Sequence, residues 1–182
     1  MIALGSNSKT RAKILKNAGI KFIVRKCDFD ESSVQAKNPD EYVFEITNGK
    51  FKTYLKDYSL DMPFVVADTI VCVNEEILLK AENEKDAKRM LELQSGMDVN
   101  IITCMIYKSR HLEFTDLSQT RYRFKKFNEK ELNGYLASGE WQGKAGACMV
   151  EGFCKPYIKS VHGLESTAMG LSIEKLLPFL RF

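Results

Sequence analysis

The sequence predicts an α/β fold in a single mixed domain, because apolar runs typical of strands alternate with segments that have the period of an amphipathic helix. The chain has 182 residues, 45% of them hydrophobic, which is enough for one sizeable core. It contains no internal repeat, low-complexity tract or Pro/Ser-rich linker. A long β-rich middle, over residues 101–127, argues against a plain repeat of βαβ units.

The first half of the chain predicts a strand, a helix, a strand, a longer helix and a strand. Residues 1–4 are the first apolar run, and a polar turn leads from them to a helix that ends before Gly19. Residues 21–27 form the second strand, and an Asn-Pro-Asp segment then begins a helix over residues 38–55. Residues 63–73 form the most apolar strand of the chain.

The second half predicts a hairpin, a helix, a β-rich stretch and a further helix. A turn precedes a returning strand over 77–80, and the following helix starts at Asn83 and ends at Ser95-Gly96. The segments 101–107 and 112–127 are β-rich, and Asn128 caps a helix that ends at Ser138-Gly139. The last third is rich in glycine, and no element is predicted there.

Composition limits the function classes. Lys plus Arg is 27 and Asp plus Glu is 24, and the resulting +3 is too mild to indicate nucleic-acid binding by charge alone. The five cysteines are odd in number and have no Cys-x-x-Cys spacing, which indicates a reducing compartment and no zinc site. The N-terminus does not resemble a secretion signal, and no apolar run approaches the roughly 18 residues of a membrane span. We expect a cytoplasmic protein without a membrane partner.

Asp68 is the main anomaly, because it lies inside the apolar strand 63–73. A carboxylate in such a strand is costly to bury unless it is paired, binds a metal, or lies where the strand opens into a cleft. A strand-end Asp that hydrogen-bonds a neighbouring loop is the alternative. The groups around Asp68 decide between the two.

Three further groups suit a phosphorylated ligand. The loop Ser6–Ser8 precedes a helix, where backbone N–H groups, hydroxyls and Arg11 are able to bind an anion, although an ordinary N-cap is the commoner case. Glu31, in an acidic cluster, and Asp68 are hard oxygen donors of the kind that Mg²⁺ prefers. A solvated loop is the alternative for Glu31. Lys80, at the end of a strand, adds positive charge.

Other patterns are weaker. Lys50 follows a glycine but lacks the earlier glycine of a phosphate loop and lies in a predicted helix, which excludes a Walker-type ATPase. The two histidines, His111 and His162, lie in polar surroundings and are expected at the surface, so no His-based triad or zinc centre is predicted. Cations alternate with aromatic residues over 121–125, which predicts a solvated strand face over a core. A nucleic-acid surface is the alternative.

A series of short motifs in order from Leu4 to Leu171 resembles the Maf family of nucleotide pyrophosphatases. The family opens with Leu-Ala-Ser-x-Ser-Pro-Arg-Arg, and residues 4–11 match this except that Gly5 replaces the alanine and Lys9 and Thr10 replace the proline and the first arginine. Val66-Ala-Asp-Thr69 matches Gly-Ala-Asp-Thr and is the firmest motif. Further matches are Asp30-Glu31, Lys50, Lys80-Ala81, Ser95-Gly96, Thr103, Gly139-Glu140, Lys144-Ala-Gly146 and Met169-Gly170-Leu171.

The resemblance implies one domain over residues 1–182, with an elongated twisted central β-sheet flanked by helices and a cleft, as in Maf and inosine triphosphatase proteins. It implies a hydrolase that cleaves the α–β phosphoanhydride bond of a nucleoside triphosphate and releases pyrophosphate, in nucleotide-pool house-cleaning. It also implies that Asp68 is the catalytic acid/base and, with Glu31, a ligand of Mg²⁺ or Mn²⁺. The implied substrate-binding residues are Ser6, Arg11, Lys50, Lys80 and Lys144.

Three positions bear on the preferred base. Members selective for dTTP and UTP have Arg, Thr and Gln where this chain has Thr10, Thr69 and Glu151, whereas members that act on 7-methyl-GTP have Trp, Gln and Glu. The chain is a hybrid of the two patterns, so the base stays open. The alternative function is a non-catalytic nucleotide sensor or cell-division regulator. A homodimer is compatible with the resemblance, and no nucleic-acid partner is expected.

Overall fold

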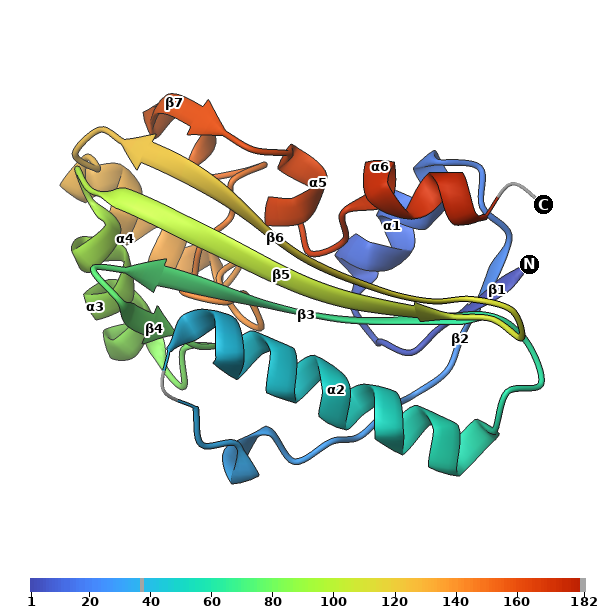
Figure 1. Cartoon of the computed structure of the whole chain (residues 1–182). Coiled ribbons are helices and arrows are strands. Elements are labelled where there is room, and N and C mark those ends of the chain that lie inside the picture. The colour runs from blue at the N-terminus through green and yellow to red at the C-terminus, as the bar shows by residue number, and fades with distance from the viewer. Residues whose placement is uncertain (37, 181–182) are drawn as a thin grey trace. The chain divides into compact units, whose positions relative to one another are not determined.

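The computed structural model describes residues 1–36 and 38–180, and its strands form a mixed sheet of the predicted α/β class (Figure 1). The order along the sheet is β2-β1-β3-β5-β6-β7, with β4 paired to β3. β1 pairs in parallel with β2 and β3, whereas the β3–β4 and β6–β7 pairs are antiparallel. The strands are β1 (Ile2–Leu4), β2 (Phe22–Val24), β3 (Phe64–Val73), β4 (Glu76–Leu78), β5 (Asp98–Lys108), β6 (Glu113–Phe124) and β7 (Ile158–His162).

The four longest helices begin where polar side chains cap their first turns. Side chains of Ser8, Asn38, Asn83 and Asn128 accept hydrogen bonds from backbone N–H groups at the starts of the four longest helices, which removes unpaired donors. These helices are α1 (Lys9–Asn17), α2 (Pro39–Tyr58), α3 (Glu84–Gln94) and α4 (Glu129–Ser138). The shorter ones are η1 (Glu31–Ser33), η2 (Lys155–Tyr157), α5 (Glu165–Ala168), α6 (Ile173–Leu176) and η3 (Leu177–Phe179).

The predicted elements are present, but three strands end earlier than predicted. β4 ends at Leu78, so Lys80 lies outside the strand that was predicted over 77–80. β2 covers only Phe22–Val24 of the predicted 21–27, because β1, its neighbour in the sheet, is itself three residues long. β6 ends at Phe124, beside a register shift in its pairing with β7, although the β-rich pattern continues to residue 127. The elements β7, α5 and α6 lie in the glycine-rich last third, where none was predicted.

The chain divides into two compact units, which are described separately. Unit 1 comprises Met1–Thr69, Thr103–Ser118 and Leu164–Phe182, and unit 2 comprises Ile70–Ile102 and Gln119–Gly163. Strands β3, β5 and β6 contribute residues to both units. The expectation of one domain over 1–182 therefore stays a prediction. Among the described residues, no helix combines the length and apolar character needed to cross a membrane.

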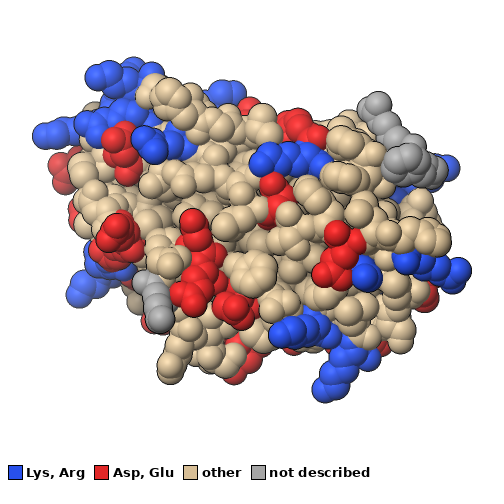
Figure 2. Space-filling model, in the orientation of Figure 1, with Lys and Arg blue, Asp and Glu red and all other residues tan. Residues whose placement is uncertain are grey.

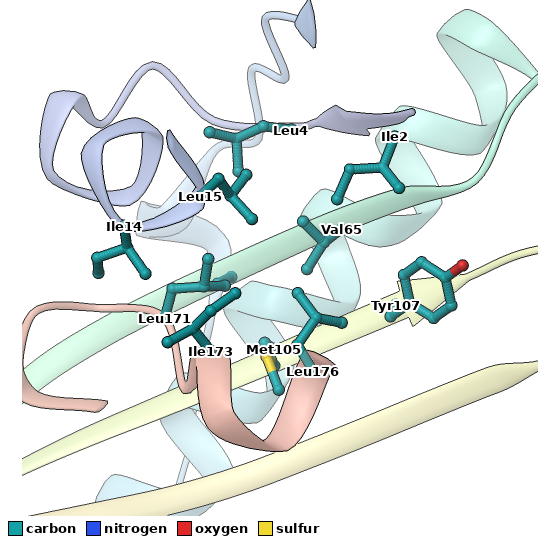
Figure 3. Packing of buried hydrophobic residues seen from close by; sticks show 11 residues of the cluster. Ile2, Leu4, Ile14, Leu15, Val65, Met105, Tyr107, Leu171, Ile173 and Leu176 are labelled. Atoms are coloured by element: carbon teal, nitrogen blue, oxygen red, sulfur yellow. The ribbon is translucent and has the colours of Figure 1, made fainter. Parts of the chain in front are cut away.

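Unit 1 has a hydrophobic cluster on each face of its strands, since successive side chains of a strand point to opposite faces. Figure 3 shows the first cluster, in which Ile2, Leu4 and Val65 pack with Leu15 of α1 and Leu176 of α6. The second cluster contains the intervening residues Ala3, Phe64, Val66 and Ile106 with Phe51 and Tyr54 of α2. We name the two sides of these strands the α1/α6 face and the α2 face.

Unit 2 has its own core, built by α3 and α4. Ala87 and Leu91 of α3 pack with Leu132, Tyr135 and Leu136 of α4. Trp141 is buried beside them, and its indole N–H donates to the carbonyl of Leu136 at 2.9 Å. Since the cluster consists of residues from unit 2 alone, this unit buries apolar surface of its own.

The cationic stretch of unit 2 is a solvated strand face, as predicted. Arg121, Arg123 and Lys125 are exposed, while Tyr122 and Phe124 between them are buried. Arg123 lies 3.3 Å from Asp98, and Figure 2 shows acidic side chains among the basic ones that gather over the ends of β6 and β7. His111 and His162 are exposed as well, which confirms the prediction that both lie at the surface.

Candidate functional site

Asp68 lies on the α2 face of β3, because it continues the alternation of Phe64 and Val66. It is 8% exposed. The Nζ of Lys50, from α2, contacts Asp68 Oδ2 and lies 2.7 Å from Glu31 Oε1. The structure thus brings together two carboxylates and one ammonium group that the sequence separates by up to 37 positions. Lys50 and Asp68 are largely buried, whereas the Glu31 side chain is 37% exposed.

The approach of Glu31 to Lys50 depends on a glycine in α2. The ring of Phe29 lies directly over Gly49, where an added Cβ would be 2.2 Å from the nearest ring atom. Only a residue without a side chain allows so close an approach. The segment before η1 therefore packs on α2 next to Lys50, and Glu31 follows two residues after Phe29.

The charges around Asp68 keep it ionised. Burial alone would raise the pKa of the Asp68 carboxyl, but the attraction of Lys50 and of Arg11, with hydrogen bonds from Lys50 and from the Thr69 amide, lowers it below its usual range. The Thr69 N–H donates to Asp68 Oδ1 at 2.7 Å. Asp68 is therefore a carboxylate at neutral pH, able to accept a proton or a hydrogen bond.

Arg11 forms the second part of the site, and it contacts the side chain of Thr69, the residue after Asp68 in β3. Its Nε donates to the Gly170 carbonyl at 2.7 Å, its Nη1 to Ser6 Oγ at 3.0 Å and its Nη2 to Thr69 Oγ1 at 3.1 Å. All three acceptors are neutral. Desolvation lowers the pKa of Arg11, against the opposing attraction of Asp68 and Glu31. A half-buried cation with neutral partners is suited to an anionic ligand.

The loop before α1 orients Arg11. Ser8 is an ordinary N-cap, whose Oγ accepts from the Arg11 N–H at 3.3 Å, so the commoner alternative holds for this serine. Ser6 Oγ accepts from the Ser8 N–H at 3.2 Å as well as from Arg11. The contacts found among the described residues use Ser6 only as an acceptor, which leaves its hydroxyl hydrogen for a ligand. Thr10, in the first turn of α1, is partly buried.

The remaining predicted residues lie in unit 2. Lys144 Nζ is 3.2 Å from Glu151 Oε1, so these two side chains form an ion pair. Lys80 is exposed and its backbone forms an isolated antiparallel bridge with Ala145. Gly146 has a φ of +60°, and a Cβ there would lie 2.9 Å from Val71, which explains the glycine of this motif. Substrate binding by Lys80 and Lys144, and base selection by Glu151, stay predictions.

The donor set fits a divalent cation that shares its coordination with a substrate. No group of three or more His, Cys, Asp or Glu side chains that would suit a metal occurs among residues 1–36 and 38–180. Glu31 and Asp68 do converge on one point, which the Lys50 ammonium occupies in the structure, so a metal ion there would take the place of that ammonium. Mg²⁺ commonly takes one or two carboxylates and fills its other positions with water and substrate phosphates. Two carboxylates are enough for a site of that kind.

Sequence reasoning missed the acceptors supplied by the C-terminal segment. The carbonyl of Gly170 holds Arg11, and the carbonyl of Thr167 accepts from Thr103 Oγ1 at 2.7 Å. Backbone carbonyls are present at every position, so no residue type signals such a role. The glycine at 170 was the one signal in the sequence. The structure explains it, since the φ of +100° at this position favours a residue without a side chain.

Comparison with known proteins identifies the family. The family model described as "Maf-like protein" matches residues 1–182, and this chain belongs to that family.

Two relatives that carry the name nucleoside triphosphate pyrophosphatase come from a Nitratiruptor species and from Helicobacter pylori. The first is 52% identical over 178 residues, which cover 97% of this chain and 96% of that protein. The second is 39% identical over 180 residues, which cover 99% of this chain and 95% of that protein. A solved structure of the Staphylococcus aureus Ham1 protein overlaps with a TM-score of 0.46 at 11% identity, over 68% of this chain and 71% of that one. That overlap is too weak to assign a fold, so the α/β class rests on the strand order of this chain.

Proposed function

We propose that this protein hydrolyses a nucleoside triphosphate to the nucleoside monophosphate and pyrophosphate. The observation that carries the proposal is the nearly buried carboxylate of Asp68, held ionised beside Lys50 and Arg11 with Glu31 converging on the same point. The family and the names of the relatives support the same reaction. The sensor alternative has no observation of its own that favours it.

In the proposed reaction, Asp68 orients a water molecule and accepts its proton while the water oxygen attacks the α-phosphorus. The α–β phosphoanhydride bond breaks, and pyrophosphate leaves with its negative charge. Lys50 and Arg11 stabilise the charge that develops on the phosphate oxygens. The ammonium of Lys50 lowers the pKa of Asp68 in the structure. Movement of Lys50 onto a substrate phosphate would raise that pKa and make Asp68 a better base.

We further propose that Glu31 and Asp68 hold a Mg²⁺ or Mn²⁺ ion together with the substrate phosphates. When bound, the ion would neutralise charge on the triphosphate. Ser6 would add a hydroxyl donor to the phosphates from the loop before α1. Lys80, Lys144 and Glu151 keep their proposed roles in binding phosphates and selecting the base.

The test is pyrophosphate release from dTTP, UTP, 7-methyl-GTP and the common nucleotides with Mg²⁺, for the wild type and Asp68→Asn. We expect the variant to lose roughly 10²-fold in turnover, the scale of a general base. Asp116→Asn is a matched control, because Asp116 is equally buried in a strand and ion-paired to Lys175, and it should keep its turnover. Triphosphate binding by the wild type without any hydrolysis would support the sensor instead.

Oxygen-18 water identifies the bond that is attacked. Attack at the α-phosphorus places the label in the nucleoside monophosphate, whereas attack at the β-phosphorus places it in pyrophosphate. We expect the label in the monophosphate, and label confined to pyrophosphate would contradict the proposed mechanism.

A further inference from the structure

The hydroxyls of Thr69 and Thr103 form a directed hydrogen-bond chain in unit 1. Thr103 Oγ1 lies 2.7 Å from the Thr167 carbonyl, which has no hydrogen, so Thr103 is the donor in this bond. Thr69 Oγ1 lies 2.8 Å from Thr103 Oγ1. Because the single hydroxyl hydrogen of Thr103 is already used, Thr69 must donate to Thr103. Thr69 Oγ1 in turn accepts from Arg11 Nη2.

The chain closes into a ring through the backbone of the C-terminal segment. The Gly170 N–H donates to the Thr167 carbonyl at 3.0 Å, and the Gly170 carbonyl accepts from Arg11 Nε at 2.7 Å. The ring therefore runs from Arg11 through Thr69, Thr103, Thr167 and Gly170 back to Arg11. Thr103 and Thr167 are almost completely buried, so water does not compete for the bond between them, whereas the bonds of Arg11 to Gly170 and Thr69 are partly buried.

Gly170 leaves room for the ring. A Cβ at this position would lie 3.1 Å from Thr69 Oγ1 and 3.2 Å from Arg11 Nε, closer than side chains normally pack. The φ of +100° adds a backbone reason for glycine. The geometry of the ring thus depends on the absence of a side chain at 170.

Thr69 also connects the ring to Asp68. Its side chain faces Arg11 while its backbone N–H donates to Asp68 Oδ1 at 2.7 Å. One residue therefore holds the cation with its hydroxyl and the carboxylate with its amide. With its hydroxyl hydrogen committed to Thr103, Thr69 has none left to donate to a nucleotide base.

We propose that Thr69 and Thr103 are positioning residues that hold the guanidinium of Arg11 in register with the Asp68 carboxylate. Of the five guanidinium hydrogens, the bonds to Gly170, Ser6 and Thr69 use three, and the contacts among the described residues leave two to point at substrate phosphate. This role rests on the proposed pyrophosphatase function. The family resemblance implies instead that Thr69 selects the base, and the base preference of Thr69→Val distinguishes the two roles.

The first test is a double-mutant cycle with Thr69→Val and Thr103→Val, which keep side-chain shape and remove the hydroxyl. We expect each variant to lose roughly tenfold in kcat for pyrophosphate release, with KM changed less, because a charge-assisted bond loses its geometry. The double variant should lose little more than either single one, since both break the same ring. Thr103→Ser, which restores the hydroxyl, should recover most of kcat.

A matched control separates positioning from a general effect of removing a buried hydroxyl. Thr47 is as buried as Thr103, and its Oγ1 donates to the Val43 carbonyl within α2 at 2.7 Å. Thr47→Val should therefore keep the wild-type kcat. An equal loss in Thr47→Val, additive losses in the double variant, or a changed base preference in Thr69→Val alone would overturn the proposal.

The second test does not depend on catalysis. The Nε–H of Arg11 donates to the Gly170 carbonyl, and in ¹H–¹⁵N spectra its exchange with solvent should be slow in the wild type and faster in Thr69→Val and Thr103→Val. An unchanged exchange rate of the Arg11 Nε–H in both variants would refute the hydrogen-bond ring. If the wild type released no pyrophosphate, the proposed function would fail, whereas this measurement would still decide whether the ring orients Arg11.

Discussion

At the scale of single residues, Lys50 has two unequal partners. Its contact with Asp68 joins side chains that are 14% and 11% exposed, whereas its contact with Glu31 joins it to a side chain that is 37% exposed. Exposed pairs contribute about 0 to 1 kcal/mol, while loss of one partner from a buried pair costs several times more. The Lys50–Asp68 pair is therefore the one that matters for stability. Glu31 is freer to leave Lys50 and to bind a metal ion or a cation that the substrate phosphates hold.

The lowered pKa of Asp68 predicts how stability depends on pH. A carboxyl whose pKa is lower in the folded than in the unfolded state contributes stability above its unfolded pKa, and this is lost as pH falls through the folded pKa. We expect the difference in unfolding free energy between the wild type and Asp68→Asn to be constant from pH 7 to about 5 and to shift against the wild type below about 4. Urea unfolding between pH 7 and about 2.5 measures it. A difference that does not change with pH would contradict the assigned charge state.

At the scale of elements, two helices carry a glycine in their interiors for different reasons. Gly49 of α2 lies under the ring of Phe29, whereas Gly134 of α4 is exposed and has no atom within 4 Å of an added Cβ. Glycine costs a helix about 1 kcal/mol relative to alanine at either position. Packing at Gly49 outweighs that cost, and nothing comparable is gained at Gly134.

The two glycines therefore predict opposite outcomes for the same substitution. Gly134→Ala should raise the unfolding free energy by about 0.5 to 1 kcal/mol. Gly49→Ala should lower it, because overpacking against Phe29 costs about 1 to 3 kcal/mol and exceeds the helical gain. It should also reduce turnover, since displacement of Phe29 moves Glu31 away from Lys50. Thermal and urea unfolding of both variants check this, and stabilisation by Gly49→Ala would show that the phenyl group of Phe29 moves at no cost.

At the scale of the whole molecule, the question is whether the two compact units unfold together. Strands β3, β5 and β6 each contribute residues to both units. Unfolding of one unit would therefore release one end of each of these strands. We expect a single cooperative transition in urea. Trp141, the one tryptophan in the sequence, is buried in unit 2 and reports on that unit by fluorescence, while far-UV circular dichroism reports on both. Coincident transitions would support one domain, and two separated midpoints would contradict it.

Much of the fold could be predicted from local patterns. The apolar run at 63–73, the asparagine caps at 38, 83 and 128, and the glycine at 139 each act within a few residues, so the elements they delimit appear in the structure. The elements after Gly139 could not be predicted in this way. They are short and irregular, and contacts such as that of Gly170 with Arg11, 159 positions earlier in the chain, hold them in place.

The sequence by itself determined the family, the period of β3 and the candidates Asp68, Glu31, Lys50 and Arg11. Only the tertiary structure decided which of them meet. Because neighbouring residues of a strand face opposite sides, the side chain of Asp68 contacts Lys50 of α2, while that of Thr69 contacts Arg11 of α1. The carbonyls of Thr167 and Gly170 complete the site. Backbone groups are the same at every position, so their roles emerge only when folding brings distant segments together.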